Sequence, residues 1–242
     1  MGNFYSAARD PIFYSHHSNI DRLWSVWKTL GGKRKDYIDP DWLNSGFLFY
    51  DENKQLVRVY VCDSLDTKKL GYVYQDVDLP WLTAKPKPRR GKIVTSSSKT
   101  TAVTKKTTTA INFPITLDKV ISTVVPRPKK SRSKEEKENE EEVLVIEGIE
   151  FDEDYPVKFD VHVNDDEQSL CGPENSEFSG SFVNVPHRKR GDNKIRTHLR
   201  LGITDILEDL GADDDDSVFV TLVPKSGKGL VTISGIKIEF IS

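Results

Sequence analysis

The chain has 242 residues, which is enough for one large domain or two small ones. Its 35 basic and 38 acidic residues nearly cancel, so no general affinity for nucleic acid is expected. A hydrophobic content of 36% indicates that part of the chain is not packed in a core. No stretch approaches the ~20 apolar residues of a membrane span. The first residues lack a basic-then-apolar leader or a transit peptide, so we expect a chain that stays in the cytosol as written.

The first predicted element is a helix from Asp10 to about Leu30. Asp10 can accept hydrogen bonds from the first free amides, and Pro11 fits the first helical position. Two glycines, Gly31 and Gly32, end the pattern. Six residues fall at helical spacing and predict one buried face, namely Phe13, His17, Ile20, Asp21, Trp24 and Trp27.

His17 is a candidate metal ligand on this helix. Asp21 lies one turn later and could hold the other ring nitrogen of His17, although it could equally form an ion pair with Arg22. His16 points about 100° away from His17 on a helix and is interpreted as structural. A copper or zinc centre needs about three good donors. We therefore expect the chain to carry only part of a metal site.

The remaining histidines and the two cysteines do not complete this site. His162 falls on the polar side of its predicted strand and His187 adjoins a basic run, so both are interpreted as surface residues. Cys62 and Cys171 form neither a disulfide framework nor a thiolate metal site.

Three regions are predicted from composition. Residues 1–84 hold all four tryptophans and form the first domain. Residues 85–110 contain eight basic and no acidic residues and are rich in Ser and Thr, which is typical of a solvated linker open to proteolysis. Residues 111–242 form the second domain.

The second domain is predicted to be all-β, a sandwich or a barrel. Residues 157–163 alternate with period two. A single helix is expected at 204–210, with Thr204 as cap and Gly211 as stop. The charged run 127–142 is interpreted as a solvated loop. The predicted strands are 143–146, 157–163, 178–185, 194–201, 217–223 and 230–241.

Several motifs together resemble plant polyphenol oxidase, a catechol oxidase or tyrosinase of the type 3 dicopper family. They are Gly2-Asn3-Phe4-Tyr5, the run from Asp10 to Trp24, Asp41-Trp42-Leu43, the run from Asp66 to Tyr74, Lys158-Phe159-Asp160-Val161 and Cys171-Gly172-Pro173. The resemblance covers essentially the whole chain but only the C-terminal part of such an enzyme. It implies a mixed fold, in which a remnant of the mainly α catalytic domain precedes an all-β shielding domain.

The resemblance also implies roles for particular residues. His17 matches the third ligand of the second copper, and Phe4 matches an aromatic gate over that copper. Tyr72 and Tyr74 match the tyrosine motif that closes the catalytic domain. The complete enzyme holds two copper ions and oxidises o-diphenols to o-quinones with O2. By the same resemblance, we expect the β-domain to pack on the catalytic domain and the whole protein to reside in the plastid, in the thylakoid lumen.

Three hypotheses about this chain follow. The first is an oxidase, which this chain alone cannot be, because one imidazole cannot hold two coppers. The second is a shielding or binding module. The third is a truncated product whose first 84 residues lack the helices against which they should pack. We expect the isolated chain to be inactive and to bind no copper stably. Whether a monophenol or a diphenol is preferred is left open.

Overall fold

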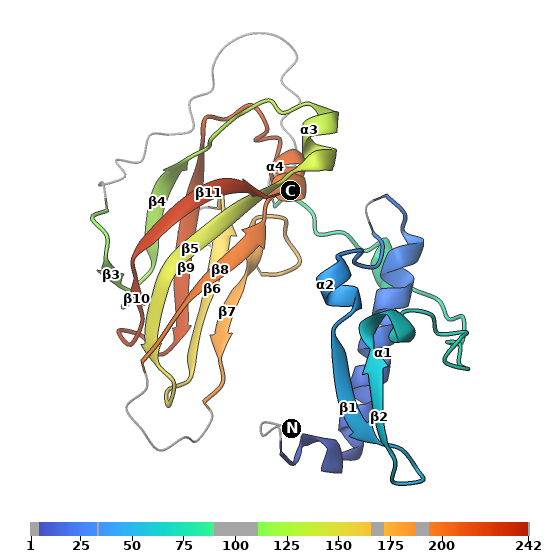
Figure 1. Ribbon diagram of the computed structural model, residues 1–242. Coiled ribbons are helices and arrows are strands. Elements are labelled where there is room, and N and C mark those ends of the chain that lie inside the picture. Colours follow the sequence, from blue (N-terminus) through green and yellow to red (C-terminus); the bar gives the residue numbers. More distant parts are fainter. Residues whose placement is uncertain (1–4, 33, 90–110, 166–171, 187–193, 242) are drawn as a thin grey trace. The chain divides into compact units, whose positions relative to one another are not determined.

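The computed structural model describes residues 5–32, 34–89, 111–165, 172–186 and 194–241. The chain folds as two compact units, residues 1–79 and residues 80–242, each of which is described by itself (Figure 1). Phe4, Cys171 and His187 lie outside the described residues.

The first unit contains one long helix and a small two-stranded sheet. Helix α1 (Pro11–Thr29) begins at Asp10, whose Oδ1 accepts the N–H of Ile12 at 3.1 Å. It ends before Gly31 and Gly32, whose φ angles are +72° and +66°. The predicted helix and both of its boundaries are therefore confirmed. The other elements are η1 (Ala7–Arg9), α2 (Pro40–Leu43), η2 (Val61–Ser64) and the antiparallel pair β1 (Gly46–Tyr50) and β2 (Leu56–Tyr60).

The first unit has no buried residue among those described. The predicted apolar face of α1 exists, but Ile20 is 51% exposed and His17 is exposed as well. The expectation that His17 is buried among aromatic residues is therefore wrong for this chain. The physical reason is that two short strands and one four-residue helix cannot cover a helix of 19 residues.

In its described ranges, the second unit is a β-domain of two sheets (Figure 1). One sheet has the order β4 (Ile121–Pro126), β9 (Ser217–Ser226), β6 (Val157–Val163) and β7 (Phe178–Asn184). The other is built on β5 (Glu141–Asp152), which pairs with β8 (Lys194–Gly202), β10 (Thr232–Ile233) and β11 (Gly235–Ile241), while β10 also pairs with β3 (Ile115–Thr116). The short helices are η3 (Pro80–Leu82), α3 (Lys134–Asn139) and α4 (Thr204–Leu210).

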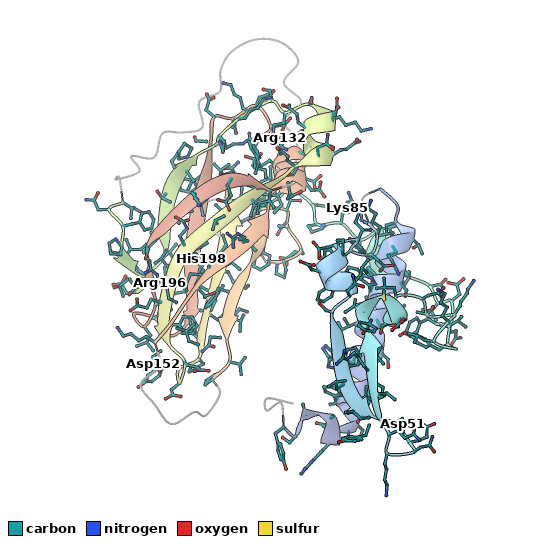
Figure 2. All side chains as sticks on the ribbon, in the orientation of Figure 1. Asp51, Lys85, Arg132, Asp152, Arg196 and His198 are labelled. Atoms are coloured by element: carbon teal, nitrogen blue, oxygen red, sulfur yellow. The ribbon has the colours of Figure 1, made fainter. Side chains whose placement is uncertain are left out.

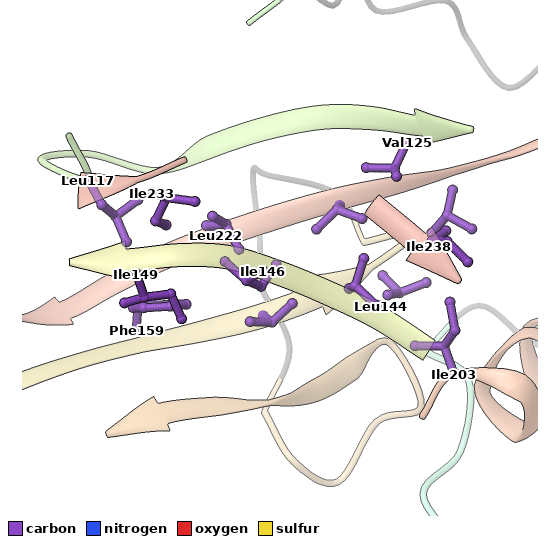
Figure 3. Packing of buried hydrophobic residues seen from close by; sticks show 14 of the residues in the cluster. Leu117, Val125, Leu144, Ile146, Ile149, Phe159, Ile203, Leu222, Ile233 and Ile238 are labelled. Atoms are coloured by element: carbon purple, nitrogen blue, oxygen red, sulfur yellow. The ribbon is translucent and has the colours of Figure 1, made fainter. Parts of the chain in front are cut away.

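The hydrophobic core of the described residues lies in this β-domain (Figure 3). The alternating residues Val157, Phe159, Val161 and Val163 of β6 are all 0–1% exposed. They pack in one cluster with residues of the other sheet, such as Leu144 and Ile146 of β5. Large side chains from both sheets thus exclude water together, which is the main stabilising term of a sandwich.

The predicted mixed fold, a helix-bearing remnant followed by a β-domain, is confirmed. Strand β6 has the predicted bounds, and α4 does too. Thr204 is not the cap of α4, however. It is the first helical residue, and its Oγ1 accepts the N–H of Glu142 at 2.8 Å.

Two further expectations are wrong. The run 127–142 is not a solvated loop, because it contains α3 and buries Arg127, Arg132 and Glu142. Arg132 precedes α3, and Figure 2 labels its side chain at that end of the domain. His162 is 1% exposed rather than on the surface. Its ring packs edge-on against Phe178, and its Nδ1 lies 3.3 Å from Asp165, so the polar face of β6 is covered as well.

Candidate functional site

The two adjacent histidines of α1 point in different directions. The ring of His17 lies against Phe13, one helical turn earlier, with 4.1 Å between ring centroids and 38° between planes. The rings of His16 and His17 are nearly perpendicular, with centroids 5.6 Å apart. Consecutive residues of an α-helix lie about 100° apart around its axis. The two histidines therefore offer separate surfaces, and only His17 shares a helix face with Asp21.

The carboxylate of Asp21 accepts hydrogen bonds from two tyrosines. The Tyr72 hydroxyl donates to Asp21 Oδ2 at 2.8 Å, and the Tyr74 hydroxyl donates to the same oxygen. The pKa of Tyr74 is raised far above its ordinary value by partial burial and by the Asp21 carboxylate. The pKa of Tyr72 is also raised, chiefly by its hydrogen bond to Asp21. Asp21 therefore joins α1 to a segment more than fifty residues downstream, a contact that sequence spacing gave no sign of.

A second polar contact supports the last turns of α1. Asp36 Oδ1 accepts a hydrogen bond from Trp24 Nε1 at 2.8 Å, and Lys28 Nζ lies 2.9 Å from Asp36 Oδ2. Burial alone would raise the pKa of Asp36, but these two donors hold it below its ordinary value. Trp24 also stacks on Trp27 with 4.6 Å between centroids. This cluster fixes the orientation of the helix that carries His17.

The two other histidines within the described ranges belong to different sheets. His162 belongs to β6, and His198 belongs to β8, where Figure 2 labels it and its Nδ1 accepts the N–H of Gly148 at 3.2 Å. Among the described residues, no group of three or more His, Cys, Asp or Glu side chains is placed to hold a metal ion. One imidazole does not meet the requirement of copper for about three donors. The described part of this chain therefore does not fit a copper pair by itself.

Other predicted site residues stand as follows. Tyr72 and Tyr74 are brought to Asp21, as described. Phe4 lies outside the described residues. None of the helices within the described ranges is both long and apolar enough to cross a bilayer.

Three family profiles match successive parts of the chain. The common central domain of tyrosinase matches residues 1–30, the polyphenol oxidase middle domain matches residues 36–87, and the chloroplastic polyphenol oxidase C-terminal domain matches residues 113–240. The first match contains α1 with His17, and the third contains most of the β-domain.

Curated relatives match along the full chain. A chloroplastic polyphenol oxidase of Malus domestica is 61% identical over 100% of this chain and 42% of its own length. The (+)-larreatricin hydroxylase of Larrea tridentata is 55% identical, with the same two shares. Aureusidin synthase of Antirrhinum majus is 53% identical over 99% of this chain and 43% of its own length. The chain thus spans about two fifths of the length of these relatives and corresponds to their C-terminal part.

Solved structures agree with this placement. Latent apple tyrosinase has a TM-score of 0.83 at 60% identity, covering 100% of this chain and 51% of that one. Latent aurone synthase from a natural source has a TM-score of 0.81 at 39% identity, covering 99% of this chain and 46% of that one. On these matches, the chain belongs to the plant polyphenol oxidase family.

Proposed function

We propose that this chain is the C-terminal portion of a copper-dependent polyphenol oxidase that oxidises o-diphenols to o-quinones with O2. The observation that carries the proposal is the order of the three matched domains, tyrosinase, middle and C-terminal, along one chain. In this proposal residues 1–84 complete the catalytic domain, residues 85–110 are a cleavable linker, and residues 111–242 shield the active site.

Within the whole protein, His17 supplies one imidazole to the second copper, and the other copper ligands come from the part that precedes this chain in its relatives. Three features support this role. His17 lies within the stretch that matches the tyrosinase domain. Its ring is exposed on α1 and steadied by Phe13. Asp21, which shares its helix face, is in turn fixed by Tyr72 and Tyr74. Phe4, by its place in the motif, restricts substrate approach to that copper.

The test joins this chain to the portion of the Malus domestica relative that precedes the matched region. We expect the chimaera to bind about two copper ions and to oxidise catechol, as a two-metal site requires. His17→Ala should lose about half of the bound copper, and it should lose the oxidase activity. His16→Ala is the matched control, because it removes the neighbouring imidazole, whose ring is nearly perpendicular to that of His17.

Three outcomes would contradict parts of this proposal. A His17→Ala chimaera with full copper content would remove His17 from the ligand set. Equal losses from His16→Ala and His17→Ala would show a helix effect instead of ligation. A parental chimaera that binds copper but oxidises neither catechol nor a monophenol would overturn the oxidase assignment.

A second candidate function is that of a non-catalytic shielding module. It is favoured by the contrast between the two units, since the β-domain has its own core and the described part of the first unit has no buried residue. Adding the full 242-residue chain to an active polyphenol oxidase should then inhibit it in a saturable way. Unchanged activity at a large excess of the chain would remove this candidate.

We further propose that the whole protein acts in the plastid, in the thylakoid lumen. Its support is the word chloroplastic in the names of relatives from Malus domestica, Larrea tridentata and Vitis vinifera. Fractionation of source tissue, with an antibody against the β-domain, should place the protein with lumenal markers. Recovery with cytosolic markers would contradict the proposal.

A further inference from the structure

The first residues of the predicted linker are bound to the β-domain through an isolated β-bridge. Lys87 forms a parallel bridge with Asn175. Its N–H donates to the Glu174 carbonyl oxygen at 3.2 Å, and its carbonyl oxygen accepts the Ser176 N–H at 3.1 Å. The side-chain amide of Asn175 donates to the same Lys87 oxygen at 3.2 Å. Both backbone groups of Lys87 are thus paired, and main-chain hydrogen bonds of this kind give affinity when an extended segment binds a domain.

Arg89 continues this contact through a buried carboxylate. Its N–H donates to Glu177, at 2.9 Å to Oε1 and 3.2 Å to Oε2. Its guanidinium lies 4.0 Å from Asp165 Oδ1. Glu177 is 4% exposed and Asp165 is 5% exposed, so the β-domain directs two buried acids at this residue. A hydrogen bond from a backbone amide to a carboxylate is among the stronger kinds.

The sequence of this segment favours the extended backbone that the contact requires. Pro86 and Pro88 flank Lys87 and have no N–H, so between residues 86 and 89 every backbone donor is bonded to the β-domain. A residue that precedes proline favours extended backbone, which applies to Lys87. Little conformational entropy is therefore lost when the strand binds.

We propose that Pro86–Arg89 is a docking strand. After the chain is cut between residues 90 and 110, this strand keeps the β-domain bound to the part of the chain that precedes the cut. The β-domain contributes Glu174 to Glu177 and Asp165, and the segment that binds there is this proline-spaced basic stretch of the same chain. A cut in the linker then does not release the β-domain from the preceding part of the chain. Its release requires that the docking strand dissociate or that the chain be cut before Pro86. The inference concerns how the chain holds together and does not depend on the proposed oxidase activity.

The test uses the full chain with the recognition sequence of a specific protease in place of residues 96–102. After complete cutting, we expect the two pieces to elute together in size-exclusion chromatography at micromolar concentration. Arg89→Pro removes the donor to Glu177 while leaving the β-domain itself unchanged. It should raise the dissociation constant of the cut pieces at least about tenfold, the factor carried by one hydrogen bond to a charged group.

Lys85→Pro is the matched control, because it adds the same proline and removes the same charge outside the docking strand. It should leave the pieces together. Separation of the parental pieces at micromolar concentration, equal effects of the two variants, or no effect of Arg89→Pro would each overturn the proposal.

Hydrogen exchange on the uncut chain gives an independent measurement. The amides of Lys87 and Arg89 should exchange at least about tenfold more slowly than an unprotected amide, because exchange requires the bond to open. Exchange of both at the rate of an unfolded peptide would overturn the proposal.

Discussion

Arg127 and Glu142 face each other inside the β-domain in a two-pronged contact. Arg127 Nε lies 2.8 Å from Glu142 Oε1, and Nη2 lies 2.9 Å from Oε2, with the two side chains 0% and 2% exposed. Arg127 Nη1 also donates to the carbonyl oxygens of Ala212, Asp213 and Asp215. Its pKa is raised, above all by the hydrogen bonds to Glu142. The pair joins the end of β4 and the start of β5 to the loop before β9.

Removal of one partner of this pair should destabilise the β-domain strongly. Glu142→Ala leaves a buried guanidinium without its counter-charge, and we expect a loss of about 3–5 kcal/mol in the free energy of unfolding. Urea unfolding followed by far-ultraviolet circular dichroism measures it. Lys130→Ala is the control. It breaks the exposed Lys130–Asp216 pair, 2.7 Å long, and should cost about 0–1 kcal/mol. Equal losses would contradict the buried role.

The contacts of Asp21 should be visible in a spectrophotometric titration of tyrosine. Tyr72 and Tyr74 have raised pKa values, so they should ionise above the ordinary tyrosine range near pH 10. Their neutral forms are favoured by folding, so this contribution to stability is present below about pH 10 and is lost as pH rises through the raised values. Asp21→Asn should move both ionisations down. Asp36→Asn, which changes contacts to Trp24 and Lys28 only, should not.

His162 should make the stability of the β-domain depend on pH. Burial lowers the pKa of its imidazole, and it outweighs the opposing effects of Asp165 and Asp160. The unfolded chain, with a histidine pKa near 6.5, therefore takes up the proton first. Stability should fall as pH decreases below about 6.5, until pH passes the lowered value. His162→Gln should flatten this part of the profile.

A titration of the His162 ring by NMR checks the same assignment without a stability measurement. Its midpoint should lie below about 6.5. Asp165→Asn should move the midpoint lower still, because Nδ1 then loses the carboxylate at 3.3 Å. A midpoint above 6.5 in the parental chain would show that the carboxylates, and not burial, dominate.

Two glycines with positive φ separate backbone strain from crowding. An added Cβ would meet nothing within 4 Å at Gly211, where φ is +68°. At Gly148, where φ is +56°, it would clash with Ser234 Oγ. Gly211→Ala should therefore cost about 1–2 kcal/mol of strain. Gly148→Ala should cost about 1–3 kcal/mol more because of overpacking. Thermal unfolding measures both, and Ser234→Gly should recover most of the difference.

Local pattern predicted the elements of this chain better than it predicted their surroundings. Period-two alternation predicted β6 and its inward face, and the Asp10-Pro11 start predicted α1. Burial of the opposite face of β6 could not be predicted, because the cover over His162 comes from Asp165 and Phe178 through tertiary contacts. For the same reason, the charged composition of 127–142 concealed the pairing of Arg127 with Glu142.

Part of the candidate site could be predicted from local sequence, and the part that depends on distant contacts could not. A motif identified His17 and the two tyrosines, and the helix start placed His17 on α1. The pairing of Asp21 with Tyr72 joins residues 51 positions apart, which no helical or strand period relates. The docking strand was not predicted either, because basic, proline-rich composition is typical of a solvated linker. The two carboxylates that receive Arg89, Glu177 and Asp165, lie about 80 residues further on.

Strand β5 pairs with strands that are synthesised much later than β5 itself. Along one edge it binds β8, and on the other it binds β10 and β11, the last of which ends at Ile241. During synthesis from the N-terminus, this sheet cannot close until β11 has left the ribosome. Maturation therefore has a fixed order, in which everything before the β-domain is already outside the ribosome when the sandwich forms. A polypeptide arrested before β11 would expose the long apolar edge of β5 to other chains, and such an exposed edge promotes aggregation.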